Sequence, residues 1–370
     1  MKIVIAPNAF KNSLPAAAAA AAILEGLSQS RLSFTGECFP VGDGGDGTGE
    51  LLIKRLAAAI IEAQARDPLG RIRQASFGLA GDTAIIEMAN ASGLRLLSRV
   101  ELDPLRALST GTGDLIRAAL DHGARHIILG MGGSATVDGG VGILTASGIR
   151  ISDSEIDTSG MDPRLAATRI TVLCDVNNPL LGPFGAAPVF GPQKGATPEE
   201  VKQLQTRLQT LAGLIQKKTG KEIATLQRGG TAGGAAAGLY GLLNAELVNG
   251  IDYFLQLTAF DKALEGADLV ITGEGSIDEQ TLQGKAPYGV ALHAKNKGIP
   301  VIGLAGRLPQ NTTKLDDYFD VLLPINHQLL HPAKALKLTD VNLAATAKAL
   351  GNLLAGWNPA GRRPDISNSA

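Results

Sequence analysis

The chain has 370 residues, of which 45% are hydrophobic, 19% charged and 4% aromatic, and its formal net charge is -1. This balance excludes a large positive field for nucleic acid or an anionic membrane, and so few aromatics disfavour base-stacking platforms. The longest apolar run, residues 16–24, is far shorter than the roughly 20 residues that span a bilayer, and two cysteines cannot form a disulfide scaffold. We therefore expect a cytoplasmic protein with no nucleic-acid or membrane partner.

Short apolar runs alternate with helical patterns, which is typical of an α/β protein with a largely parallel sheet. The elements expected first are a strand at 3–6, a helix at 14–27, a strand at 34–41 and a helix near 49–59. Ser13 is the expected N-cap of the first helix. The stretch 60–88 then holds three β-like runs whose connecting turns are short enough for antiparallel hairpins.

The rest of the chain returns to alternating strands and helices. The middle elements expected are helix 113–120, strand 126–131, helix 140–147, a surface loop at 152–163, strand 170–175 and helix 198–219, capped by Thr197. The last are strand 269–272, helix 288–297, strands 301–305 and 321–325, and helix 342–354. Residues 229–241 are dense in Gly and Ala, which lets backbones approach closely.

Buried, parallel-type strands at both chain ends predict an α/β fold in which a Rossmann-like parallel-sheet domain is built from both ends of the chain. We expect that domain at 1–59 and 255–360, a second, mixed α/β domain inserted at 60–254, and a disordered tail at 361–370. Strands 3–6, 269–272 and 301–305 should then share one sheet.

Two Gly-rich loops each follow a strand and precede a helix, where backbone N–H groups favour an anion. The first, GDGGDGT at 42–48, has more Asp and Gly than a turn with Asx caps needs, which favours a ligand loop. The second, LGMGGSATVDGG at 129–140, is compatible with phosphate binding through N–H groups and the hydroxyls of Ser134 and Thr136. It matches neither the dinucleotide fingerprint nor a Walker loop, and no Gly-Lys pair is followed by Ser or Thr, so a P-loop kinase is excluded.

Charged residues follow other strands. Asp175 is placed to act as a general base, or equally to cap a turn before Pro179. Glu274 and Asp278 are compatible with Mg²⁺ binding and equally with solvated loop acids. Lys285 and Lys194 lie in loops where an ordinary exposed lysine is the simpler interpretation. The five histidines lack zinc-site spacing, and no G-x-S-x-G elbow supports a serine hydrolase.

Eight strings, taken together and in order, resemble the bacterial glycerate kinase family, the two-domain type that lacks a P-loop. They lie at 3–14, 42–48, 109–113, 129–140, 174–182, 189–197, 229–238 and 267–287. The resemblance covers nearly the whole chain and implies ATP-dependent phosphorylation of D-glycerate, with 2-phosphoglycerate favoured as the product. The sequence departs from the family at Asn8 and Ala9, where the family often has Asp-Ser before Phe-Lys. The change puts a metal-binding role of Asn8 in doubt, whereas Lys11 is retained. Asp46 stands where Glu is common in the family.

The resemblance and the needs of phosphoryl transfer suggest a role for each candidate. Asp175 is the candidate base; Lys11 and Lys285 are the candidates for pairing phosphates or the glycerate carboxylate. Mg²⁺, brought with ATP, is assigned to Glu274 and Asp278. Substrate and phosphate contacts are assigned to Asp43, Asp46, Thr48, Gly132, Gly133, Ser134, Asp138 and Lys194.

Two alternatives remain at this stage. One is a kinase for another small hydroxy acid, and the other is a non-catalytic sensor of a phosphorylated acid. A sensor needs the anion loops but not the carboxylates, so the joint presence of Asp175, Glu274 and Asp278 favours an enzyme. A homo-oligomer is compatible with the sequence.

Overall fold

The computed structural model describes residues 1–328 and 331–356, and the expected tail at 361–370 lies outside them. The chain divides into two compact units. Unit 1 comprises Met1–Val41, Ala259–Leu282 and the described residues from 286 onward, and unit 2 comprises Gly42–Thr258 and Gln283–Lys285. Residues 42–59, 255–258 and 283–285, all expected with the chain-end domain, group with unit 2. Within the described part of the chain, no helix has both the length and the apolar character needed to cross a bilayer.

Unit 1 contains a five-stranded parallel sheet in the order β13-β12-β11-β1-β2. Its strands are β1 (Lys2–Ile5), β2 (Thr35–Cys38), β11 (Leu269–Ser276), β12 (Val301–Arg307) and β13 (Val321–Pro324). Ile3 pairs with Leu269, so the first strand lies beside one from the last third of the chain. The predicted sharing of one sheet, and a fold with an inserted domain, are confirmed.

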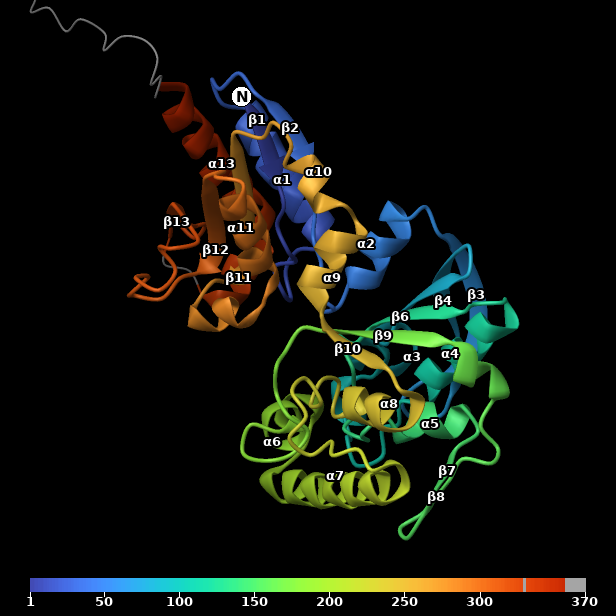
Figure 1. Cartoon of the computed structure of the whole chain (residues 1–370). Helices are drawn as coiled ribbons and strands as arrows, with labels where there is room; N and C mark the ends of the chain where they lie inside the picture. The colour runs from blue at the N-terminus through green and yellow to red at the C-terminus, as the bar shows by residue number, and fades with distance from the viewer. Residues whose placement is uncertain (329–330, 357–370) are drawn as a thin grey trace, which may run out of the picture. The chain divides into compact units, whose positions relative to one another are not determined.

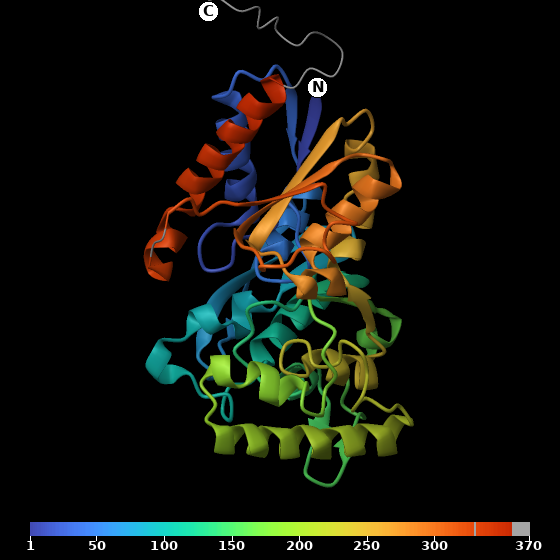
Figure 2. The same cartoon turned by 90° about the vertical axis from the view of Figure 1, so that its left-hand side faces the viewer.

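Helices cover both faces of the unit 1 sheet. Helices α1 (Ala16–Ser28) and α13 (Thr339–Gly356) pack together on one face, and α11 (Ala286–Asn296) lies on the other (Figure 2). A Cβ at Gly26 would lie 2.1 Å from the Ala344 carbonyl oxygen, so glycine is required where α1 and α13 cross. The predicted Ser13 cap is wrong: Pro15 occupies the N-cap position of α1, and the Ser13 hydroxyl donates to Leu336 O and Thr339 Oγ1.

Unit 2 contains a six-stranded sheet in the order β10-β9-β6-β5-β4-β3 (Figure 1). Its strands are β3 (Ala59–Arg66), β4 (Ile72–Ala80), β5 (Thr83–Glu87), β6 (His126–Gly130), β9 (Arg169–Cys174) and β10 (Glu246–Asn249). The first three form the expected antiparallel hairpins, whereas β5, β6, β9 and β10 run parallel. The sheet is therefore mixed, as predicted, and its four parallel strands end at one edge.

The main helices of unit 2 follow the predicted pattern in part. They are α2 (Thr48–Arg55), α4 (Thr110–Asp121), α5 (Val141–Ala146), α6 (Ala186–Phe190), α7 (Pro198–Thr219), α8 (Ala235–Leu243) and α9 (Gly250–Leu257). Helix α7 has the predicted bounds, and Thr197 caps it in a reciprocal capping box with Glu200. The sequence did not predict β10, α8 or α9, and the loop expected at 152–163 includes the strand β8 (Ile156–Asp157), paired with β7 (Arg150–Ile151).

Candidate functional site

The edge of the unit 2 sheet where its parallel strands end, here called the carboxyl edge, gathers most of the predicted site residues. The 42–47 loop crosses it: the backbone N–H groups of Met131 and Gly132 both donate to Gly44 O at 3.0 Å. A Cβ at Gly44 would lie 2.5 Å from Leu173 O on β9, so only glycine permits this approach. The two predicted Gly-rich loops are thus one bonded structure.

The acidic side chains of this loop are held in different ways. Asp43 is 5% exposed, and its Oδ1 accepts the Gly45 N–H at 3.2 Å. A Cβ at Gly45 would lie 2.9 Å from Asp43 Oδ1 and 3.8 Å from Asp175 Oδ2, so these carboxylates flank the same glycine. Asp46 is exposed and forms an ion pair with Arg95 at 3.5 Å. The buried Thr48 hydroxyl accepts the Gly44 N–H at 3.1 Å and closes the loop.

Lys194 is buried, with an exposed fraction of 3%, in the short 3₁₀ turn Pro192–Lys194. Its Nζ donates to Ser134 Oγ at 2.8 Å and to Thr136 O at 2.7 Å. Burial lowers the pKa of Lys194 to about 7, against the opposing attraction of Asp138 and Asp175. The exposed-lysine interpretation is therefore wrong for this residue, because its amine lies inside the loop that follows β6.

This burial predicts a measurable pH dependence of stability. Because the folded-state pKa of Lys194 is about 7 and its ordinary value is 10.5, the unfolded chain binds more protons between those values, and the free energy of unfolding should rise with pH there. The contribution of Lys194 is about 1.4 kcal/mol per pH unit at most. Chemical denaturation across that range should show that Lys194→Met removes this rise. The exposed control Lys202→Met should keep it; an unchanged slope in Lys194→Met would contradict the lowered pKa.

Asp138 has a set of partners that supports a positioning role. Its carboxylate accepts the N–H and hydroxyl of Ser109, at 2.9 and 2.7 Å, and the N–H groups of Gly140 and Gly142, at 3.0 and 2.9 Å. These donors belong to the beginnings of α4 and α5, which Asp138 thereby joins. Gly132 N–H is already bonded to Gly44 O, so of the three loop residues expected to hold phosphate through their N–H groups, Gly133 and the buried Ser134 remain as candidates.

Lys285 belongs to a short segment that two asparagines hold against the carboxyl edge. Asn177, in the loop after β9, donates its side-chain amide to Gln283 O at 2.7 Å, and Asn249, the last residue of β10, donates to Gly284 O at 3.1 Å. Asn249 Oδ1 also accepts the Asp252 N–H and caps α9. The sequence did not single out either asparagine; for Asn249, an amide directly after a short apolar run is the signal that could have found it.

A second residue missed from the sequence is Glu87, which ends β5 at the same edge. It is 6% exposed, and its carboxyl group accepts the backbone N–H of Gly47. The only signal was an acidic residue that ends a buried β-like run, a pattern also seen where a strand reaches solvent.

The remaining candidates lie in unit 1, where β1 and β11 end. Asn8 is buried and donates its N–H to Gly273 O at 2.8 Å. Lys11 is exposed, and its backbone nitrogen lies 3.6 Å from where a Cβ of Gly275 would stand. Glu274 is 7% exposed and accepts the Thr281 hydroxyl at 3.1 Å, so it is not a solvated loop acid.

Asp278 is arranged as a cap in unit 1. Its Oδ1 accepts the Gln280 N–H at 2.9 Å, and its own N–H donates to Thr281 Oγ1 at 3.1 Å. The Thr281 hydroxyl therefore links the Glu274 carboxylate, to which it donates, to the backbone N–H of Asp278, from which it accepts.

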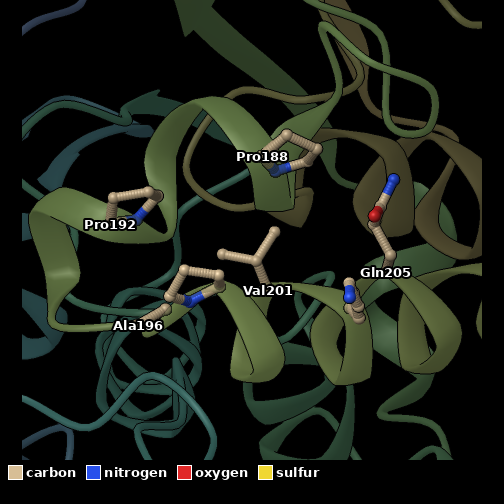
Figure 3. A pocket seen from close by; sticks show the side chains of 7 residues that line it. Pro188, Pro192, Ala196, Val201 and Gln205 are labelled. Carbon is tan, nitrogen blue, oxygen red and sulfur yellow. The ribbon is translucent and has the colours of Figure 1, made fainter.

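An apolar hollow of about 410 Å³ lies on unit 2 (Figure 3). Its lining comes from α6, the Pro192–Lys194 turn, the link to α7 and α7 itself: Pro188, Pro192, Ala196, Pro198, Val201, Lys202 and Gln205. None of the predicted site residues is in this lining, and its proline and aliphatic side chains offer little to bind an anionic substrate.

Comparisons with known proteins agree over nearly the whole chain. The model of the glycerate kinase family matches residues 3–355. A glycerate kinase of Haemophilus influenzae is 43% identical over 374 residues, covering 96% of this chain and 99% of that protein. The glycerate 2-kinase of Escherichia coli K12 is 42% identical over 348 residues, covering 88% and 91%. A crystal structure assigned as a glycerate kinase 2 of Salmonella typhimurium LT2 aligns with a TM-score of 0.79 and 42% identity, covering 96% of this chain and 98% of that one.

Proposed function

The chain belongs to the glycerate kinase family, and from this membership we propose that it transfers the γ-phosphoryl group of ATP to D-glycerate and forms 2-phosphoglycerate. The observation that carries the proposal is the length of the match, residues 3–355. The preference for the 2-position rests on the Escherichia coli relative, a glycerate 2-kinase at 42% identity. The sensor interpretation loses its support, because the family is one of kinases.

Unit 2 supplies the groups proposed to act on the acid substrate. Asp175 follows β9 and shares the surroundings of Gly45 with Asp43, so either carboxylate can orient a substrate hydroxyl, and Asp175 is the proposed base. Lys194 acts through Ser134, whose hydroxyl it bonds. Lys285 is proposed to pair with phosphate oxygens as negative charge develops during transfer.

Unit 1 supplies the groups proposed for Mg²⁺–ATP. Magnesium takes one or two protein carboxylates and keeps water and phosphate oxygens as its other ligands. Glu274, a buried carboxylate at a strand end, fits this requirement, and Asp278 fits it less well because it caps the following turn. Bound Mg²⁺ would neutralise phosphate charge, and Lys11 is proposed to add a positive charge to the same region.

Glu274→Gln should raise the Mg²⁺ concentration needed for half-maximal activity by about tenfold or more, because the amide loses the charge but keeps the shape. The amide oxygen can still accept the Thr281 hydroxyl, so the fold should persist. The measurement is a Mg²⁺ titration of ATP turnover, with the exposed Glu279→Gln as a matched control. An unchanged Mg²⁺ titration in Glu274→Gln would exclude Glu274 as a magnesium ligand.

The proposed reaction is tested by ATP turnover with a panel of short hydroxy acids, followed by NMR of the product. We expect D-glycerate to give the highest kcat/KM and the phosphorus coupling to appear at the C2 proton. Higher turnover with another hydroxy acid would identify that acid, and not D-glycerate, as the preferred substrate. Coupling at C3 would correct the position of transfer and leave the kinase assignment in place.

A further inference from the structure

Glu87 occupies a position that the proposed reaction has not used. It ends β5 beside the 42–47 loop, and its Oε1 accepts the N–H of Gly47, which has a left-handed backbone (φ 91°) and immediately precedes α2. A Cβ at Gly49, in the first turn of α2, would lie 3.2 Å from both Cβ and Oε2 of Glu87. The carboxyl group is therefore packed under the end of the loop that carries Asp43 and Asp46.

The charged groups around Glu87 come from three neighbouring segments. Asp46 lies in the loop, Glu50 on α2, and Arg95 in the 3₁₀ turn Leu94–Leu96. Burial raises the pKa of Glu87 to about 7; the Gly47 N–H and Arg95 oppose the shift, and the negative charges of Asp46 and Glu50 add to it. Glu87 therefore changes its charge near neutral pH at a buried position beside the 42–47 loop. Arg95 forms its ion pair with the exposed Asp46 of that loop.

We propose that Glu87 is a positioning residue for the acid substrate: its Oε1 anchors the 42–47 loop through Gly47, and its ionisation weakens substrate binding at that loop. The proposal rests on the proposed function, because it takes the loop as part of the substrate site. A protonated carboxyl group still accepts the Gly47 N–H through its carbonyl oxygen. Ionisation adds a buried negative charge beside Asp46, which disfavours an anionic acid nearby.

The expected behaviour therefore has a definite direction. KM for D-glycerate should rise as pH increases through the neutral range, since the ionised form repels the substrate carboxylate. Glu87→Gln keeps an oxygen acceptor for Gly47 but cannot ionise, so its KM should lack this rise. Glu87→Ala removes the acceptor, and loss of one such hydrogen bond should raise KM by about tenfold at every pH. A merely structural residue would not separate the glutamine from the alanine variant in this way.

One measurement in this experiment, the NMR titration of a backbone amide, does not depend on catalysis. In protein labelled with [¹⁵N]glycine, the Gly47 amide resonance should titrate near neutral pH in wild type and in the exposed control Glu50→Gln, and should stay fixed in Glu87→Gln. Steady-state KM for D-glycerate is measured on the same variants over the same pH range. A Gly47 amide that does not titrate in wild type, or a Glu87→Gln KM profile identical to wild type, would overturn the proposal. Absence of glycerate kinase activity alongside a titrating Gly47 amide would overturn the proposed function instead, together with the substrate role of the loop.

Discussion

Replacing Asp175 by asparagine is expected to lower kcat for phosphoryl transfer by about a hundredfold or more, with ATP affinity little changed. The residue directly follows β9, so the sheet fixes its backbone, and its carboxylate lies beside Gly45 together with Asp43. Asparagine keeps the size and most hydrogen bonding but removes the basicity. General-base help typically contributes ~10²–10⁴-fold, although a loose transition state makes positioning important as well.

The measurement combines steady-state kinetics with calorimetric ATP binding on the folded variant. The matched control is Asp153→Asn, at an exposed position on unit 2. If kcat of Asp175→Asn stays within about threefold of wild type, a base worth ~10²-fold is ruled out. Asp175 would then be a turn cap before Pro179, and Asp43 and Asp46 would be the next candidates for the base.

Replacing Lys285 by methionine is expected to lower kcat by ~10²–10³-fold, the usual loss when one preorganised positive group is removed from a developing negative charge. The segment that carries Lys285 is held by side-chain amides of Asn177 and Asn249. Gly284 must be glycine there, because its φ is +102° and a Cβ would lie 2.3 Å from Asn249 Nδ2. Such fixing of the backbone reduces the reorganisation needed when charge develops.

Two further variants separate the charge of Lys285 from its placement. Asn249→Ala leaves the lysine in place but removes one of the two anchors, so kcat should fall by about tenfold, the equivalent of one hydrogen bond. The control Lys297→Met removes an exposed lysine that directly follows α11 and should leave kcat unchanged. Full activity in Lys285→Met would show that Lys285 is an ordinary loop lysine with no role in phosphoryl transfer.

The sequence predicted those parts of the fold that depend on strong local patterns. The apolar strands at both chain ends and the capping box at Thr197 are examples, because strand burial and helix capping each require particular residue types at neighbouring positions of the sequence. The helix beginning after Ser13 was predicted with the wrong cap, because that hydroxyl is used by Leu336 and Thr339, more than 300 residues away. Local pattern cannot show such a partner.

The site was predictable to a similar extent. Gly-rich loops and carboxylates after strands identified most candidates, but the sequence cannot show that Lys194 is buried, since the acceptors Ser134 Oγ and Thr136 O come from another loop. Glu87 and Asn249 were missed for the same reason. Each ends a strand like many exposed polar residues, and the fold brings to them the distant backbone atoms of Gly47 and Gly284, which the sequence does not show.

The pairing of β1 with β11 also bears on how the chain acquires its structure during synthesis. The Thr272 hydroxyl that bonds Ala6 O lies 266 residues after it, so at about 5–20 residues per second the ribosome needs tens of seconds to deliver the partner strand. Unit 2, almost wholly contained in Gly42–Thr258, can be complete by then. During that interval Ile3, Val4 and Ile5, all 0% exposed in the finished fold, have no β11 to cover them. Completion of unit 1 should therefore be the late step, limited by long-range strand pairing, and its nascent N-terminal strand the segment most in need of a chaperone.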